Sequence, residues 1–215
     1  MTGKIKAAIF DMDGTLVDSM WIWQSIDVEY LKKKNISFPD DLKAAIEHLG
    51  FHDTARYFKE RFNLKESIEE ITDDWTQMAY KHYAGDIKLK PYAREYLLYL
   101  KNKNIKLGLA TSNCNLLVET ALKPLGIYDL FDSITTTDEV DRDKSFPDVY
   151  LLAAKRLGVS PHECIVFEDI LPAILSAKKA GMTVVAVHDE SSIKSSVDIK
   201  DTADKFIVSY DEIIA

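Results

Sequence analysis

Hydrophobic residues along this chain form short continuous runs in some places and recur at every third or fourth position in others. The first run extends from Ile5 to Phe10, is broken only by Lys6, and is followed by Asp11, Asp13 and Gly14. A short apolar run that ends at a turn signal is typical of a buried strand. We therefore predict a strand at Ile5–Phe10, with Asp11 at its carboxyl end.

The stretch from Ser19 to Gly85 predicts helices and no strand. Apolar side chains recur at helical spacing in four places, and Ser67 stands near a predicted helix start. The four places are marked by Ile22, Ile26 and Tyr30, by Leu42, Ile46 and Leu49, and by residues 53–62 and 66–83. We expect residues 19–85 to form a small all-helical domain of their own.

From Pro91 onward the predicted strands and helices alternate, as they do in a parallel α/β sheet. The predicted helices cover residues 91–103, 115–123, 147–157 and 172–180, and the predicted strands cover 106–111, 133–137, 163–167, 183–187 and 205–208. The expected fold is therefore α/β, with a Rossmann-like parallel sheet core. Residues 1–18 and 86–215 form this core, and the helical domain is inserted after its first strand.

The balance of charges limits the partners that this chain can have. Its 215 residues carry a formal net charge of -8, with acidic and basic residues interspersed and a sequence pI of about 5.2. A chain with this charge is not expected to bind nucleic acid or an anionic membrane as its main partner. A small anionic metabolite would therefore need local positive charge, from a metal ion and a few lysines. Nothing in the sequence indicates an obligate protein partner.

The cysteines and the apolar runs indicate the compartment. Cys114 and Cys164 are the two cysteines, too few for a disulfide framework in a chain of this size, so we expect reduced thiols. No apolar stretch reaches the length of a membrane span, and the start of the sequence does not resemble a secretory signal. A cytoplasmic protein is expected.

Asp11 and Asp13 lie where open α/β sheets bind their ligands, outside the carboxyl end of a strand. Two carboxylates this close repel each other and lose hydration, so a positive charge is expected to join them. A site made of oxygen atoms suits Mg²⁺ better than a softer metal. A calcium-binding loop is excluded, because Leu16 and Val17 interrupt the series of oxygen ligands that it requires.

A second polar group, Thr111-Ser112-Asn113, follows the predicted strand 106–111. Hydroxyl and amide groups at a strand end can bind phosphate oxygens together with the backbone N–H groups of the next helix. The alternative is an ordinary helix cap, in which Ser112 or Asn113 precedes the apolar residues 116–118. The residues alone leave both interpretations open.

Two further charged segments are equally ambiguous when each is taken alone. Lys144 precedes a helix that begins with Pro147, and it ends the charged run 141–144, so it is either a site cation or part of a salt-bridged surface loop. Glu168 and Asp169 end an apolar run, as Asp11 does. They are either site carboxylates or caps of the next helix.

Taken in order, the four segments resemble the four motifs of the haloacid dehalogenase superfamily, in its phosphatase and mutase branches. Those motifs are Asp-x-Asp-Gly-Thr after a strand, a Thr or Ser at a strand end, a Lys before a Pro-Asp helix start, and a pair of acids. Their counterparts here are residues 11–15, Thr111, Lys144 with Pro147 and Asp148, and Glu168 with Asp169. The resemblance covers nearly the whole chain.

This resemblance implies a phosphoric monoester hydrolase that transfers the phosphoryl group of a small phosphorylated metabolite. It implies that Asp11 attacks phosphorus and becomes an aspartyl-phosphate, while Asp13 donates and accepts protons. It also implies that Thr111 and Lys144 share the phosphate charge. Ser112 and Asn113 resemble additional phosphate contacts.

The resemblance implies one cofactor, Mg²⁺. The implied ligands are Asp11, the backbone carbonyl of Asp13, and Asp169, with Glu168 bound either directly or through a water molecule. The helical domain 19–85 resembles a type I cap, which closes over the site and excludes bulk water.

The helical domain favours a hydrolase of monophosphates over a sugar-phosphate mutase. Similar mutases carry a histidine where this chain has Trp23, and a Ser-Arg pair after a glycine that grips a second phosphate. The comparable stretch here, Gly50-Phe51-His52-Asp53, has no arginine, and Asp53 would repel a phosphate. A mutase and a catalytically silent binding module on the same fold are the alternatives. Dehalogenation is disfavoured, because it needs neither Asp13 nor a second pair of acids.

Overall fold

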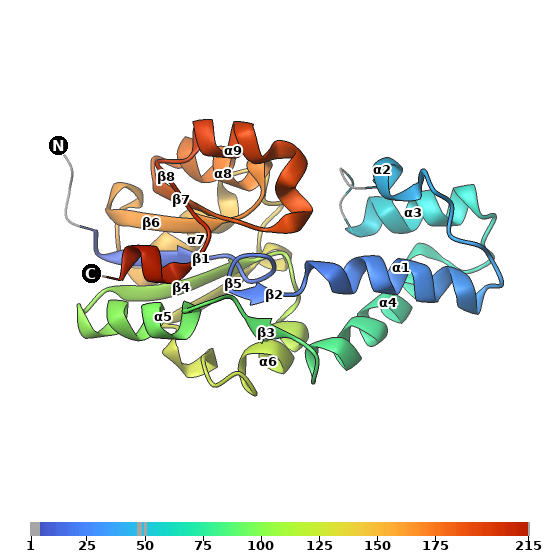
Figure 1. The fold of residues 1–215 in the computed structure, drawn as a ribbon, viewed down its shortest axis with the longest axis horizontal. Coiled ribbons are helices and arrows are strands. Elements are labelled where there is room, and N and C mark those ends of the chain that lie inside the picture. Colours follow the sequence, from blue (N-terminus) through green and yellow to red (C-terminus); the bar gives the residue numbers. More distant parts are fainter. Residues whose placement is uncertain (1–4, 47–48, 50, 215) are drawn as a thin grey trace. The chain divides into compact units, whose positions relative to one another are not determined.

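The computed structural model describes residues 5–46, 49 and 51–214. Their contacts divide them into two compact units (Figure 1). One unit contains the residues up to Ser19 together with those from Ile87 onward, and the other is Met20–Asp86. The sequence predicts two domains, one made of residues 1–18 and 86–215 and the other of residues 19–85. That these segments fold as separate domains stays a prediction.

Within the described residues, six strands form one sheet in the order β5-β4-β1-β6-β7-β8. Every pairing in this sheet is parallel, which confirms the predicted α/β fold. The strands are β1 Ala7–Phe10, β4 Lys106–Thr111, β5 Ser133–Thr136, β6 Cys164–Glu168, β7 Thr183–Val187 and β8 Lys205–Ile207. Because β1 lies between β4 and β6, the polar residues after these three strands share one edge of the sheet.

The two faces of the sheet are covered by different side chains, because successive residues of a strand point to opposite sides. Ile9 and Val166 pack on one face with Tyr150 of α7 (Asp148–Leu157), and with residues of α8 (Leu171–Lys179) and α9 (Ser196–Thr202). On the other face Phe10 stacks on its register partner Phe167, with 4.5 Å between ring centroids. The helices of this unit are α5 Ala93–Asn102, α6 Asn115–Leu122, α7 Asp148–Leu157, α8 Leu171–Lys179 and α9 Ser196–Thr202.

Short elements complete this unit, and the sequence pattern did not predict them. The two-residue strands β2, Val17–Asp18, and β3, Lys88–Leu89, pair in antiparallel fashion where the chain leaves for the helical unit and returns from it. Strands this short show no periodicity in the sequence. Short 3₁₀ helices also occur: η1 Tyr128–Leu130, η2 Thr137–Glu139, η3 Pro161–Glu163, η4 Glu190–Ser195 and η5 Tyr210–Ile213.

The helical unit contains α1 Met20–Lys33, α2 Leu42–Ile46, α3 Phe51–Arg61 and α4 Ile68–Tyr83. Its core contains an aromatic cluster, in which the ring centroid of Trp75 lies 5.7 Å from that of Tyr30 and 5.0 Å from that of Phe58. Ser67 caps α4, since its side chain accepts from the N–H of Glu70 while the Glu70 carboxylate accepts from the N–H of Ser67.

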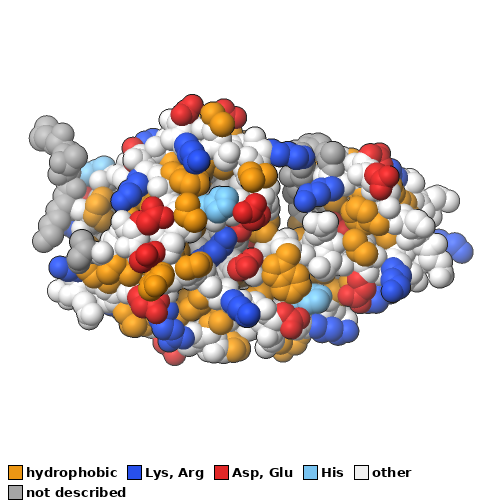
Figure 2. Space-filling model, in the orientation of Figure 1, with side chains coloured by type: hydrophobic (Ala, Val, Ile, Leu, Met, Phe, Trp, Pro, Cys, Tyr) orange, Lys and Arg blue, Asp and Glu red, His pale blue; other side chains and the backbone are white. Residues whose placement is uncertain are grey.

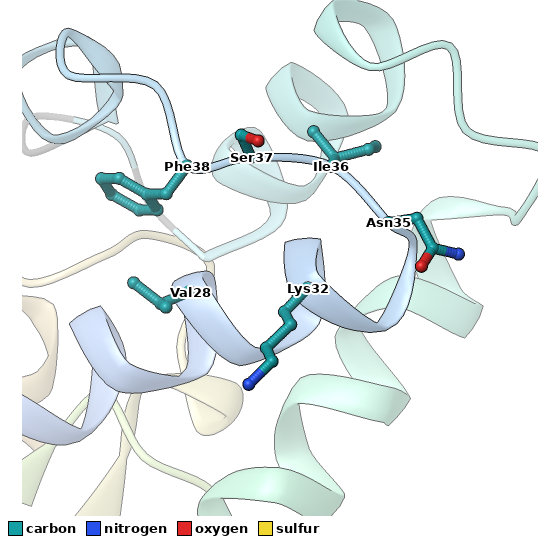
Figure 3. A pocket seen from close by; sticks show the side chains of 6 residues that line it. All are labelled: Val28, Lys32, Asn35, Ile36, Ser37 and Phe38. Carbon is teal, nitrogen blue, oxygen red and sulfur yellow. The ribbon is translucent and has the colours of Figure 1, made fainter.

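One hollow lies on the surface of the helical unit, between α1 and the segment that follows it (Figure 3). Its lining residues are Val28, Lys32, Asn35, Ile36, Ser37 and Phe38. With one charged side chain and no acid among these residues, the hollow offers no catalytic pair.

The distribution of charges on the surface and the lengths of the helices match what the composition of the chain indicates. Acidic, basic and hydrophobic side chains are interspersed over the face that Figure 2 shows. No helix in the described part of the chain is both long enough and apolar enough to cross a membrane. The cytoplasmic location expected from the sequence stays a prediction.

Candidate active site

Asp11 lies directly after β1 in the middle of the sheet, where its N–H donates to the carbonyl of Phe167 (3.0 Å). Its side chain is nearly buried. The chain then turns at Gly14, which has a φ of +77°. A Cβ at this position would lie 2.8 Å from Cγ of Asp169, so only glycine allows the turn to approach that carboxylate so closely.

Lys144 lies inside the site and not on the surface. Its side chain is only 6% exposed, and Nζ lies 2.7 Å from Oδ1 of Asp11 while it also contacts Glu168. Burial alone would lower the pKa of Lys144, but the charges of Asp11 and Glu168 raise it above its ordinary value. The surface ion pair of this loop is made by Arg142 and Asp148 instead (2.8 Å).

Glu168 at the end of β6 is fully buried and receives three hydrogen bonds. Oε1 accepts from Nζ of Lys144 and from the hydroxyl of Tyr150 (2.7 Å), and Oε2 accepts from the N–H of Asp169 (3.0 Å). Burial and the charge of Glu168 raise the pKa of Tyr150 well above its ordinary value, so its hydroxyl stays a donor. The sequence analysis missed Tyr150, because a tyrosine on a helix resembles any core residue.

Asp169 offers the free oxygen of this cluster. Its Oδ1 accepts from the hydroxyl of Thr15 (2.9 Å), whereas Oδ2 is buried and has no hydrogen-bond partner. Neither Asp169 nor Glu168 caps the next helix, because the N-cap of α8 is Ile170, which makes no side-chain cap. Oxygen atoms of Asp11, Glu168 and Asp169 lie within 4.8 Å of one another.

The electrostatic environment of this cluster favours binding of a cation. Burial raises the pKa of Asp11 to about 8, with Glu168 and Asp13 adding to the rise and Lys144 opposing it. Burial, Glu168 and Asp11 likewise raise the pKa of Asp169 well above its ordinary value. A divalent cation would favour the charged forms, and a donor set of oxygen atoms suits a hard ion such as Mg²⁺. The residues present therefore fit that ion.

The side chains of Ser19 and Asn113 hold Asp13. The hydroxyl of Ser19 donates to its Oδ1 (2.5 Å), and the amide of Asn113 donates to its Oδ2. Asn113 was predicted to contact phosphate, and the structure brings it to this carboxylate. Ser19 is completely buried, and no pattern in the sequence pointed to it.

Thr111 ends β4, beside β1, and is buried. Its hydroxyl accepts from the N–H of Asn113 (3.1 Å), while Ser112 is exposed. The N-cap of α6 is Cys114, which makes no side-chain cap. The alternative interpretation, that Ser112 or Asn113 is the N-cap of this helix, is therefore wrong.

A second ion pair, also absent from the sequence analysis, lies close to the cluster. Nζ of Lys90 lies 2.7 Å from Oδ2 of Asp189, and both side chains are largely buried. The charge of Asp189 contributes to the raised pKa of Asp169. Since Lys90 follows β3 and Asp189 follows β7, this pair ties the returning chain to the edge of the sheet that carries Asp169.

Comparisons with known proteins give a consistent result. The family model described as haloacid dehalogenase-like hydrolase matches residues 8–187. YhcW of Bacillus subtilis is 36% identical over 188 residues, covering 86% of this chain and 84% of that protein. The phosphorylated carbohydrates phosphatase of Thermotoga maritima is 30% identical over 178 residues, covering 83% and 82%. Hexitol phosphatase B of Escherichia coli is 27% identical over 190 residues, covering 86% and 84%.

Solved structures share the fold. A HAD hydrolase of family IA, variant 3, from Entamoeba histolytica superposes with a TM-score of 0.85 at 26% identity, covering 97% of this chain and 95% of that one. CbbY of Rhodobacter sphaeroides in complex with xylulose-(1,5)bisphosphate also has a TM-score of 0.85, at 23% identity, covering 97% and 96%. The likeness to CbbY is one of fold alone.

Proposed function

The chain belongs to the haloacid dehalogenase-like hydrolase family and is a phosphoric monoester hydrolase, and we propose that it acts by a Mg²⁺-dependent, aspartyl-phosphate mechanism on a small phosphorylated metabolite. The observation that carries this proposal is the buried cluster of Asp11, Glu168 and Asp169, in which Asp11 and Glu168 contact the ammonium of Lys144. A buried group of three acids and one lysine keeps an excess of negative charge, which a metal ion and a phosphoryl group together would balance.

Asp11 supplies the nucleophile. A carboxylate oxygen of Asp11 attacks phosphorus, and the bond from phosphorus to the alcohol oxygen of the substrate breaks. Asp13 donates a proton to the departing alcohol and then accepts one from the water that attacks the aspartyl-phosphate. Ser19 and Asn113 hold both oxygens of Asp13 and so fix the direction of these proton transfers.

Thr111, Ser112 and Lys144 are proposed to bind the transferred phosphoryl group. The Lys144 ammonium is held in place before substrate arrives, since it already contacts Asp11 and Glu168. Such preorganised charge stabilises a transition state without reorganisation during the reaction.

Asp11, the backbone carbonyl of Asp13, and Asp169 are proposed to hold Mg²⁺. The ion would neutralise phosphate charge and orient the phosphoryl group for in-line attack. Asp169 is the better side-chain ligand of the adjacent acids, because its Oδ2 has no hydrogen-bond partner.

A phosphorylated carbohydrate is the proposed substrate class. The names of the relatives from Thermotoga maritima and Escherichia coli support it, since they refer to phosphorylated carbohydrates and to a hexitol. A polyhydroxylated substrate of this kind offers an alcohol as leaving group, which Asp13 would protonate.

Contacts inside the helical unit support a phosphatase over a mutase. A mutase needs a cationic clamp for the second phosphate of its substrate, and Arg56 and Lys59 are the first cations after the stretch 51–53 in the sequence. Arg56 is paired with Asp53 at 2.5 Å, and Lys59 donates to the carbonyls of Leu64 (3.3 Å) and Glu66. Both cations are engaged within the unit itself. His48 and Gly50 lie outside the described residues.

We expect the protein to hydrolyse β-glucose 1-phosphate slowly at most, and not to isomerise it. With Mg²⁺ and a catalytic amount of β-glucose 1,6-bisphosphate, inorganic phosphate should be released at most slowly and no glucose 6-phosphate should form. Without a clamp, the sugar is not positioned to compete with water for the aspartyl-phosphate. Separate enzymatic assays for phosphate and for glucose 6-phosphate measure the two products, and p-nitrophenyl phosphate serves as an unspecific substrate.

EDTA should stop phosphate release, and added Mg²⁺ should restore it. Rapid formation of glucose 6-phosphate would establish the mutase instead. No phosphate from any phosphomonoester in a panel of sugar phosphates would indicate the catalytically silent module.

Asp13→Asn should lower kcat by about 10²–10⁴, the usual contribution of a general acid–base group. The asparagine amide keeps the shape of the side chain and cannot exchange a proton with the leaving alcohol. Steady-state kinetics on p-nitrophenyl phosphate and on a sugar phosphate should differ, because the p-nitrophenolate anion leaves without protonation. Because Asp13 also serves the second step, which both substrates share, the comparison uses kcat/KM, which reports the first step. The decrease in kcat/KM should be larger for the sugar phosphate, and equal decreases on both substrates would remove the acid role from Asp13.

A further inference from the structure

Glu168 is enclosed by hydrogen-bond donors, although it lies in the carboxylate cluster. A carboxylate has about four acceptor positions. Three of those on Glu168 are filled, by Lys144 and Tyr150 on Oε1 and by the N–H of Asp169 on Oε2. Asp169 differs, because its Oδ2 is free of protein donors. The two adjacent acids therefore have different surroundings and can have different tasks.

The hydroxyl of Tyr150 is one of the donors that distinguish the surroundings of Glu168 from those of Asp169. The Tyr150 ring belongs to the hydrophobic core on the α7 face of the sheet, and a phenylalanine would fill that space equally well. The hydroxyl adds one contact within hydrogen-bond distance, to Oε1 of Glu168 at 2.7 Å. Hydrogen bonds to a buried charge are stronger than those between neutral groups, so this contact restrains the carboxylate.

The restraint extends to the lysine. Nζ of Lys144 is shared between Oδ1 of Asp11, at 2.7 Å, and Oε1 of Glu168. Among Asp11, Glu168 and Lys144, the lysine has the most flexible side chain. The position of its ammonium is therefore set by the positions of the two carboxylates. Tyr150 and Lys144 meet at the same oxygen of Glu168, so a shift of that carboxylate would move the ammonium relative to Asp11.

We propose that Tyr150 is a positioning residue, whose hydroxyl holds Glu168 against Lys144 so that Glu168 places the ammonium beside Asp11 and does not itself ligate the metal ion. This inference rests on the proposed function. It assigns the two adjacent acids separate roles: Asp169 binds Mg²⁺, and Glu168 orients the cation that faces the nucleophile and the phosphoryl group.

The test is Tyr150→Phe, with Tyr96→Phe as its control. Tyr96 is also a buried tyrosine of the same unit, but its ring packs against Phe167 on the opposite face of the sheet. We expect Tyr150→Phe to lower kcat for phosphate release about tenfold while the calorimetric Kd for Mg²⁺ changes less than about threefold. Tyr96→Phe should leave both quantities at wild-type values, and the thermal unfolding midpoints of the two variants should be similar.

A double variant shows whether the hydroxyl acts through Glu168. In the Glu168→Gln background the ionic contact with Lys144 is already lost, so adding Tyr150→Phe should lower kcat less than about twofold further. Glu168→Gln alone should reproduce the fall in kcat with the Kd for Mg²⁺ within about threefold. This single variant keeps the inference testable if Tyr150→Phe does not fold.

Four outcomes would overturn the inference. They are an unchanged kcat in Tyr150→Phe, an equal tenfold fall in the Glu168→Gln background, a tenfold weaker Mg²⁺ affinity in Tyr150→Phe, and a tenfold weaker Mg²⁺ affinity in Glu168→Gln. Wild-type protein without phosphatase activity would overturn the proposed function and this inference together. An active wild type with an unaffected Tyr150→Phe variant would overturn this inference alone.

Discussion

Asp11→Asn should abolish metal-dependent phosphate release while the protein stays folded. An amide oxygen is too weak a nucleophile to attack phosphorus, so the covalent path through the aspartyl-phosphate is closed. The side chain keeps its shape, and Lys144 retains its contact with Glu168. Steady-state assays with a sugar phosphate and with p-nitrophenyl phosphate measure the loss, and circular dichroism reports the fold.

The Asp11→Asn variant should unfold at no lower temperature than the wild type when Mg²⁺ is absent. The pKa of Asp11 in the folded protein, about 8, lies above its ordinary value of 3.8. The folded state therefore binds more protons than the unfolded state between these pH values, and it loses stability as the pH rises through them. Replacing the carboxylate with a neutral amide removes that loss near neutral pH.

Asp198→Asn is the matched control, since it makes the same chemical change at an exposed position on α9. It should keep wild-type turnover. More than a trace of metal-dependent turnover in Asp11→Asn, in protein free of wild-type contamination, would refute a mechanism in which Asp11 forms the covalent bond.

Asp169→Ala should weaken Mg²⁺ binding more than about 100-fold and thereby remove nearly all activity. Loss of a residue in the outer shell of a metal site commonly costs 10- to 100-fold in affinity, and loss of a direct ligand should cost more. The free, buried Oδ2 of Asp169 is the reason for assigning it as that ligand. Isothermal titration calorimetry with Mg²⁺ gives the affinity directly and does not depend on turnover.

Glu168→Ala is the informative comparison for Asp169→Ala, because it removes the adjacent acid of the same cluster. We expect a smaller loss of Mg²⁺ affinity, since the oxygens of Glu168 already accept hydrogen bonds from Lys144, Tyr150 and the Asp169 backbone. The reverse order of affinities would exchange the roles of the two acids. Circular dichroism of both variants separates loss of the metal from loss of the fold.

The sequence by itself determined the class of fold and the place of the candidate site. Apolar runs predicted the strands that became β1, β4 and β6, and polar residues followed each of them. Parallel strands point their carboxyl ends to the same edge of a sheet, so these residues were expected to meet. The structure brings Asp11, Glu168 and Asp169 together there, as that argument requires. Local patterns suffice for this step, because strand periodicity and turn signals are properties of neighbouring residues.

Only the tertiary structure decided what each polar side chain contacts. From the sequence Lys144 was equally consistent with a surface loop, and Asn113 with a helix cap. The structure buries Lys144 against two carboxylates and brings Asn113 to Asp13, 100 residues away along the chain. Tyr150 and Ser19 carried no signal at all, because a single hydroxyl has no periodicity or motif. Its partner is set by strand register and helix packing, which join residues that are distant in sequence.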